Sequence, residues 1–189
     1  MKRILIIAVL FVIFPANTFA AARQNNQLLQ ATTAALAVQS LQLGDKAQQL
    51  FSIKKGLLEI VRTKESHLTS QEDMMIDAAA EMKYIATVAY FEGNLLGAVL
   101  ALKKEFKLHF INDRILELEH AIEGTISSLQ AVQVAHSRIE DRSAIGQLDR
   151  SIMAVREILE IYRNSIEILQ RIKKKEFGEE EIKQPSKAR

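Results

Sequence analysis

A glutamate and a histidine at helical spacing are the first feature that could do chemistry. Glu117 and His120 have the Glu-x-x-His spacing of di-iron bundles, which use two such motifs and further carboxylates. No second Glu-x-x-His occurs in the chain. The apolar positions Ile115, Leu118 and Ile122 define the inward seam of this segment, so Glu117 and His120 fall on its outward side. The sequence therefore argues against a di-iron site.

Three further side chains could hold a divalent cation. Glu105, His109 and Asp113 are spaced four residues apart, so a continuous helix would place them on one face. However, Asn112 and Asp113 are also typical N-cap residues. We expect Asp113 to cap a helix, and Glu105 and His109 to form a solvated pair. No metal site and no cofactor is predicted.

A charge inside an apolar stretch is the strongest candidate for a site. A buried carboxylate such as that of Glu92 needs a partner or becomes protonated. If antiparallel helices turn near residues 67, 111 and 140, Glu92 lies level with Gln130 and Arg150. Arg150 or Gln130 is then the expected partner. The predicted site comprises Glu92, Asn94, Gln130 and Arg150.

Two interpretations of this site are open. The same count of residues along the helices places Gly44-Asp45 and Gly93-Asn94 at the level of Glu92. The site is then either a polar layer that fixes the alignment of the helices, as single polar residues do in coiled coils, or a pocket for a small molecule or an ion.

Composition excludes several classes of protein. The chain has no Cys, which excludes thiol catalysis, disulfide bonds and Cys-ligated metals. It contains no Gly-rich phosphate loop, no His-Glu-x-x-His and no Gly-x-Ser-x-Gly. Ser, His and Asp are present, but their spacing places no catalytic pair together. We therefore expect a protein that is not an enzyme.

Residues 1–22 are predicted to be a cleavable secretory signal peptide. A basic start is followed by an apolar run over residues 4–14, which ends at Pro15 and is too short for a membrane anchor. Cleavage is expected after Ala20 or Ala22. The mature protein is then exported, periplasmic or secreted, with no stable membrane insertion.

The charge of the mature chain argues against binding to nucleic acid. Loss of Lys2 and Arg3 with the signal reduces the 25 basic residues to 23, which equals the number of Asp and Glu residues. A basic footprint is therefore missing. The dense basic run at residues 171–175 is followed almost at once by acidic residues, which is typical of a solvated helix end. Residues 179–189 are predicted to be a disordered charged tail.

The elements that must position these residues are long helices. Apolar residues recur at helical spacing throughout, and residues 16–184 contain no proline. Alternating steps of three and four residues keep one seam of a helix facing its neighbours, and short connections favour antiparallel neighbours. We predict an all-α fold in residues 23–178. It is an elongated antiparallel up-down bundle with helices at residues 25–65, 70–110, 112–139 and 141–177.

The first of these helices could be divided. Gly44-Asp45 offers a break followed by an N-cap, so residues 24–66 form either one helix or two. A mere kink leaves one rod that matches the next helix in length, whereas a tight turn folds two short helices back on each other. We favour one rod, and hence four helices.

Two apolar surfaces need an explanation. Residues 84–102 carry a single charge, on Glu92, and are therefore expected to belong to the most buried helix. The last helix has a second apolar line beside its seam, made of Ile158, Ile161, Ile168 and Ile172. Either the core wraps widely around that helix, or this line faces another chain.

These features together favour an exported protein without enzymatic activity. We expect a protein-interaction or structural component of the bacterial cell envelope, which binds another protein chain or associates with itself. The alternative is a periplasmic ligand- or signal-sensing bundle. It would hold a small molecule or an ion between its helices, at the predicted polar site.

Overall fold

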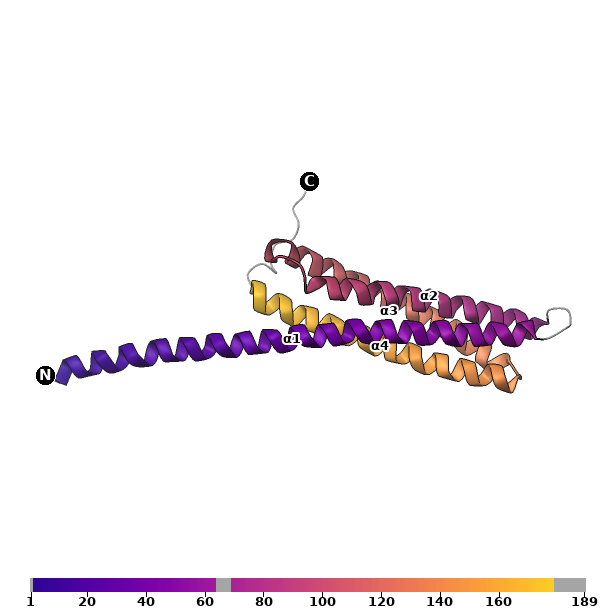
Figure 1. The fold of residues 1–189 in the computed structure, drawn as a ribbon, viewed down its shortest axis with the longest axis horizontal. Coiled ribbons are helices and arrows are strands. Elements are labelled where there is room, and N and C mark those ends of the chain that lie inside the picture. Colours follow the sequence, from indigo (N-terminus) through magenta and orange to yellow (C-terminus); the bar gives the residue numbers. More distant parts are fainter. Residues whose placement is uncertain (1, 64–68, 179–189) are drawn as a thin grey trace.

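The computed structural model describes the backbone of residues 2–63 and 69–178, and the side chains of residues 27, 29–63 and 69–178. These residues form four helices: α1 (Lys2–Arg62), α2 (Ser70–Val99), α3 (Lys104–Arg138) and α4 (Arg142–Phe177). No strand occurs in the part of the chain that the structure describes. Figure 1 shows four rods lying lengthwise, with the N-terminal part of α1 extending beyond the other three. The predicted all-α, elongated up-down bundle is confirmed.

Each helix packs against two neighbours. α1 and α3 both contact α2 and α4, whereas α2 and α4 touch only lightly across the core. α1 runs without interruption through Gly44-Asp45, so the prediction of one N-terminal rod is confirmed. A glycine inside a helix costs only about 1 kcal/mol, which packing along a long helix readily offsets. Among the described residues, no helix has the combination of length and hydropathy that crossing a membrane requires.

Local signals in the sequence locate several helix ends. The Thr69 hydroxyl accepts a hydrogen bond from the Glu72 N–H over 3.4 Å, and the Glu72 carboxylate accepts one from the Thr69 N–H over 2.6 Å. These two hydrogen bonds form a capping box at the start of α2. The Asp141 carboxylate caps α4 by accepting from two backbone N–H groups of its first turn. Gly178 follows α4 with a φ of 75°, a conformation that favours glycine.

The turn between α2 and α3 lies earlier than the sequence predicts. The pattern predicts a helix up to residue 110, but α2 ends at Val99 and α3 begins at Lys104. Residues 100–103 contain neither Gly nor Pro. Lys103, the N-cap residue of α3, makes no side-chain capping hydrogen bond, so no local signal marks this turn. The expected cap at Asp113 is wrong, because that residue lies exposed inside α3.

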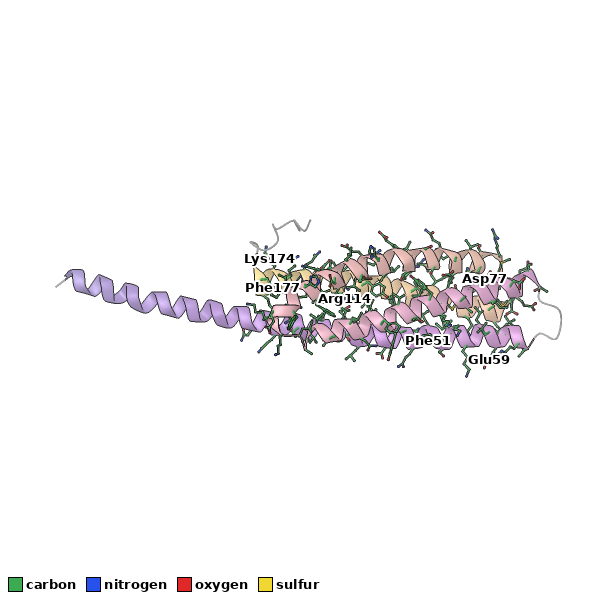
Figure 2. The ribbon with its side chains drawn as sticks, turned by 90° about the horizontal axis from the view of Figure 1, so that it is seen from above. Phe51, Glu59, Asp77, Arg114, Lys174 and Phe177 are labelled. Atoms are coloured by element: carbon green, nitrogen blue, oxygen red, sulfur yellow. The ribbon has the colours of Figure 1, made fainter. Side chains whose placement is uncertain are left out.

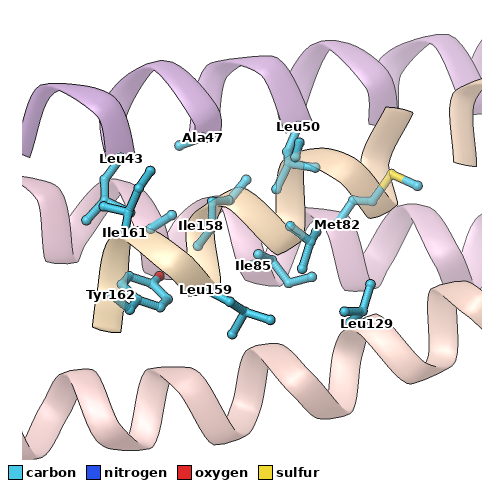
Figure 3. Close-up of a cluster of buried hydrophobic side chains, with 14 of the residues drawn as sticks. Leu43, Ala47, Leu50, Met82, Ile85, Leu129, Ile158, Leu159, Ile161 and Tyr162 are labelled. Atoms are coloured by element: carbon cyan, nitrogen blue, oxygen red, sulfur yellow. The ribbon is translucent and has the colours of Figure 1, made fainter. Parts of the chain in front are cut away.

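The core runs along the bundle and takes side chains from all four helices. Figure 3 shows its central part, where α1 contributes Leu43, Ala47 and Leu50 opposite Ile158 and Ile161 of α4. The second apolar line of α4 belongs to this core, since Ile158, Ile161, Ile168 and Ile172 are all buried. Of the two alternatives, the core that wraps widely around α4 is the one observed, and this line does not form a free face for another chain. Because α1 and α3 flank α4 on two sides, the core covers a wide stripe of it.

α1 and α2 approach closely at one glycine. The Ser40 hydroxyl of α1 donates a hydrogen bond to the Gly93 carbonyl oxygen of α2 over 2.7 Å. A Cβ atom on Gly93 would lie 3.0 Å from the Ser40 carbonyl oxygen and 3.1 Å from the Leu43 Cβ. It would also lie 3.6 Å from the Gly44 nitrogen. Gly93 is thus level with Leu43 and Gly44, as counting from a turn near residue 67 predicts.

Some expectations concern residues that the structure does not describe. The charged tail at residues 179–189 and the turn near residue 67 lie outside the described residues. The backbone of residues 2–22 belongs to α1, but the side chains of the predicted signal are also outside the described set. Cleavage after Ala20 or Ala22 therefore stays a prediction.

Candidate functional site

The acidic residue within the apolar part of α2 pairs with an arginine of α3. Glu92 is 8% exposed, and both of its carboxylate oxygens lie 3.3 Å from Nη1 of Arg114. The guanidinium of Arg114 also lies over the Phe110 ring, 5.5 Å from its centroid, which is a favourable cation–π arrangement. In Figure 2, Arg114 lies nearer to the Phe177 end of the bundle than to the end marked by Asp77. The ion pair is thus off the middle of the bundle.

The partners expected from the sequence are wrong. Gln130 and Arg150 are both exposed, and the Arg150 Nε donates to the Gly146 carbonyl oxygen of its own helix. Asn94 is exposed as well. The cause is the early turn between α2 and α3, which moves α3 along the bundle and brings Arg114 to the level of Glu92 in place of Gln130.

Arg114 could have been found from its place beside the seam. It lies three residues after Ile111 and four before Leu118, both of which are buried in the core. Helical spacing therefore places Arg114 next to the inward face of α3. Its role as the partner of Glu92 depended on the position of a turn that carries no local signal.

Burial dominates the electrostatics of Glu92. Loss of contact with water raises the pKa of its carboxyl group, the positive charge of Arg114 lowers it, and the negative charge of Glu117 raises it again. The net result is a pKa above the ordinary value. The ion pair with Arg114 therefore compensates the burial of this carboxylate only in part.

Two buried hydroxyl groups accompany the ion pair. Tyr162 of α4 and Thr125 of α3 are both completely buried. Thr125 is near enough to influence Tyr162, yet within the described part of the chain neither hydroxyl makes a hydrogen bond of ordinary geometry. Burial, followed by the charges of Glu92 and Tyr84, raises the pKa of Tyr162. The Tyr162 hydroxyl is thus close enough to Glu92 to sense its charge, from the core side.

A hollow of about 260 Å³ lies on the solvent side of Glu92, between α2 and α3. Polar and charged side chains line one part of it, and small or apolar side chains line the rest. Its lining residues are Tyr84, Thr87, Val88, Phe91, Glu92, Glu117, His120 and Ala121. We call this hollow the α2–α3 pocket.

Two aromatic rings flank the α2–α3 pocket. Tyr84 and Phe91 are seven residues apart on α2, which places them on the same side of that helix. Tyr84 lies across Gly124 of α3, where an added Cβ would be only 2.7 Å from the Tyr84 hydroxyl oxygen. The glycine thus lets the tyrosine ring reach over to α3.

α2 is more exposed than its composition predicts. Tyr84, Tyr90 and Phe91 are 49%, 48% and 60% exposed, respectively, and the rings of Tyr90 and Phe91 make an edge-to-face contact with centroids 6.1 Å apart. We call these three residues the aromatic surface. As expected for the most buried helix, α2 has a larger share of buried residues than α3 or α4, but one side of it faces solvent. Its small residues, including Ala86 and Ala89, fill the core while its aromatic residues face outward.

The other acidic and histidine residues that the structure describes do not assemble a metal site. The side chains of His109 and Asp113 lie 3.5 Å apart on the surface of α3, so Asp113 and not Glu105 is the partner of His109. Glu117 and His120 are exposed, as their outward positions predict. Within residues 27–63 and 69–178, as far as their side chains are described, no three such groups could hold one metal ion.

Comparisons of the chain with protein-family models, curated proteins and solved structures give no match. The function must therefore be argued from the site itself. Chemically, this arrangement is suited to recognition. The faces of the aromatic rings can contact apolar or cationic groups, and the carboxylates can bind positively charged groups.

Proposed function

We propose that this protein is an exported, non-enzymatic helical bundle of the bacterial cell envelope, and that it acts by binding another protein through the aromatic surface of α2. The observation that carries the proposal is the exposure of Tyr84, Tyr90 and Phe91 on one helix. Tyrosine and other aromatic residues are enriched at protein interfaces and depleted among fully solvated positions. Single exposed apolar residues need no explanation, but three large rings on one helix do.

The remaining parts of the proposal have separate support. Export rests on the signal-like pattern of residues 1–22. Binding in preference to catalysis is supported by the chemistry of the site, in which Glu92 is already paired with Arg114. The apolar line of α4 gives no support for a partner, because the core covers it. The aromatic surface of α2 is therefore the proposed partner-binding surface.

Capture of partners from a native envelope extract tests the proposal. The immobilised mature chain is compared with two variants of matched size. One carries Tyr90→Ser and Phe91→Ser on α2. The control carries Phe51→Ser and Met153→Ser, which alter exposed apolar residues of α1 and α4. We expect the wild type and the control to retain the same protein, and the α2 variant to lose it.

Two outcomes would contradict the proposal. One is the capture of the same protein by all three chains, and the other is the absence of any specific capture by the wild type. Circular dichroism of each variant shows whether the bundle is intact. Sedimentation of the purified chain shows whether the partner is a second copy, since a dimer that the α2 variant fails to form would identify self-association.

A second candidate function is the binding of a small ligand. It is favoured by the α2–α3 pocket, because ligand sites are concave and combine apolar walls with a few polar groups, such as Glu92 here. A thermal-shift screen of metabolites and divalent ions against the wild type and Glu92→Leu separates it from protein binding. Stabilisation of the wild type that the variant lacks would favour this second function.

A further inference from the structure

The residues that line the α2–α3 pocket include two carboxylates and no lysine or arginine. Two of its lining residues are carboxylates, Glu92 and Glu117, and Arg114 pairs with the first of them. His120, also in the lining, adds no charge in its neutral form. Glu117 is close enough for its charge to oppose ionisation of Glu92. A cation that enters the pocket would relieve this repulsion.

A second polar feature lies in the core behind the pocket. Tyr162 is completely buried on the core side of Glu92 and does not itself line the pocket. Its hydroxyl lies near Thr125, although no hydrogen bond of ordinary geometry joins it to the described residues. The charges of Glu92 and Tyr84, both lining residues, act on this hydroxyl. A buried hydroxyl without a partner is uncommon in native proteins. The two residues whose charges act on it also line the pocket, so a bound cation would change the charge that this hydroxyl senses.

The remaining walls of the pocket suit an aliphatic chain that ends in a positive charge. Val88 and Ala121 provide apolar contact in the middle, and lysine side chains bury their methylene stems along such surfaces. The ring faces of Tyr84 and Phe91 attract cations within about 6 Å of the ring centre. A carboxylate beside such rings adds charge attraction for an ammonium group.

We propose that the α2–α3 pocket binds the ammonium group of a lysine side chain on the protein partner, with the charge directed at Glu92 and Glu117 and the stem along Val88. This inference rests on the proposed function, since it assigns the chemistry of the partner at the same surface. Tyr84 and Phe91 belong both to the pocket and to the aromatic surface. A partner that covers the aromatic surface therefore also closes the pocket.

Titration with a blocked lysine tests this inference on the full mature chain. The probe is N-acetyl-lysine methylamide, and N-acetyl-norleucine methylamide is the control without charge. Backbone amide signals are followed by NMR. We expect saturable shifts confined to residues 84–92 and 117–121 with the lysine probe, and none with the norleucine probe. Rising salt should weaken the binding, because the pocket opens to solvent.

Matched substitutions on α3 locate the contact. Glu117→Gln removes one pocket carboxylate from an exposed position, whereas Glu119→Gln makes the same change at an exposed position that does not line the pocket. We expect the first to weaken lysine binding about five-fold, as the loss of one charge contact of about 1 kcal/mol implies, and the second to leave it unchanged. Equal binding of both probes, or equal binding by both variants, would overturn the inference.

A third probe distinguishes a protein side chain from a free amine. n-Butylamine carries the same ammonium group without the backbone. Tighter binding of butylamine than of the blocked lysine would assign the pocket to a free amine and overturn the assignment to a partner lysine.

The partner-capture experiment reports separately on the proposed function. If capture depends on Tyr90 and Phe91 but the lysine probe does not bind, only this inference fails. If the lysine probe binds but the Tyr90→Ser/Phe91→Ser variant still captures the partner, the proposed function fails.

Discussion

Glu92 is a buried charge that its neighbours compensate only in part. Burial raises its pKa more than Arg114 lowers it, and Glu117 adds to the effect. Such pairs are weak sources of stability, because the loss of hydration of both ions offsets much of their attraction. Removing one partner is different, since the other charge then stays buried alone. These two properties give opposite results for single and double substitutions.

We expect Glu92→Leu alone to lower the free energy of unfolding by about 3 kcal/mol, because it leaves Arg114 without a partner. Arg114→Met alone should have a similar effect. The double variant Glu92→Leu/Arg114→Met should unfold within about 1 kcal/mol of the wild type, or be more stable. Urea unfolding of the four chains measures this cycle. A double variant that loses as much as the two single variants together would contradict the account.

The free energy of unfolding of the same chains should depend on pH in a defined direction. Since the pKa of Glu92 is raised above 4.5 in the folded state, the folded chain binds this proton more tightly than the unfolded chain. The associated stability is present at low pH and is lost as the pH rises through the folded pKa. Relative to the double variant, the wild type should therefore become less stable as the pH rises from about 4.5 to 7. The opposite trend would show that the charge of Arg114 lowers the pKa of Glu92 more than burial raises it.

At the residue scale, the sequence reveals Glu92 but not its surroundings. A lone charge in an apolar helix points to a buried site, and Glu92 is indeed buried. Its partner could not be predicted, because residues 100–103 reverse the chain without Gly, Pro or a side-chain cap. Arg114, Tyr162 and Thr125 come together only once that turn is in place.

At the element scale, α1 and α2 are aligned by a glycine and a serine. Gly93 packs against the Ser40 carbonyl and the Leu43 side chain, and its own carbonyl accepts the Ser40 hydroxyl proton. Gly44, on the facing helix, has no heavy atom within 4 Å of an added Cβ. The two glycines are thus level with each other but have different roles. Gly93 permits the close contact between α1 and α2, whereas Gly44 only lowers helix propensity.

This difference predicts opposite effects of the same substitution. Gly93→Ala should lower the free energy of unfolding by about 1–3 kcal/mol, because its Cβ meets backbone and side-chain atoms that must shift. Gly44→Ala should raise it by about 0.5–1 kcal/mol through better helix propensity. Thermal and urea unfolding measure both changes. Effects of the same sign would show that the α1–α2 contact is not as close as described.

The apolar lines of the helices were predictable, but their partners were not. The spacing of Ile158, Ile161, Ile168 and Ile172 shows a second apolar face on α4. Whether that face meets the core or another chain depends on how α1 and α3 are placed around α4. Periodicity carries no information on that arrangement. The capping signals at Thr69, Asp141 and Gly178, by contrast, are local and were all predictable.

At the scale of the whole molecule, the four-rod architecture follows from the pattern of the sequence, and the proposed binding surface does not. Long proline-free segments of helical period lead to the up-down bundle. The low charge of residues 84–102 correctly indicates a largely buried helix, yet three aromatic residues within this stretch face outward. Alanine and glycine fill the inner side of α2 in their place. Mean hydropathy cannot tell these two arrangements apart.

The central claim is that the aromatic surface of α2 meets a protein partner in the cell envelope. Site-specific photocrosslinking in intact cells tests it most directly. A benzophenone amino acid replaces Phe91 of α2 in one chain and Met153 of α4 in another, because both positions are exposed in the free bundle. The account predicts a discrete crosslinked species from position 91 and none from position 153. No crosslink from position 91, or the same species from both positions, would contradict it.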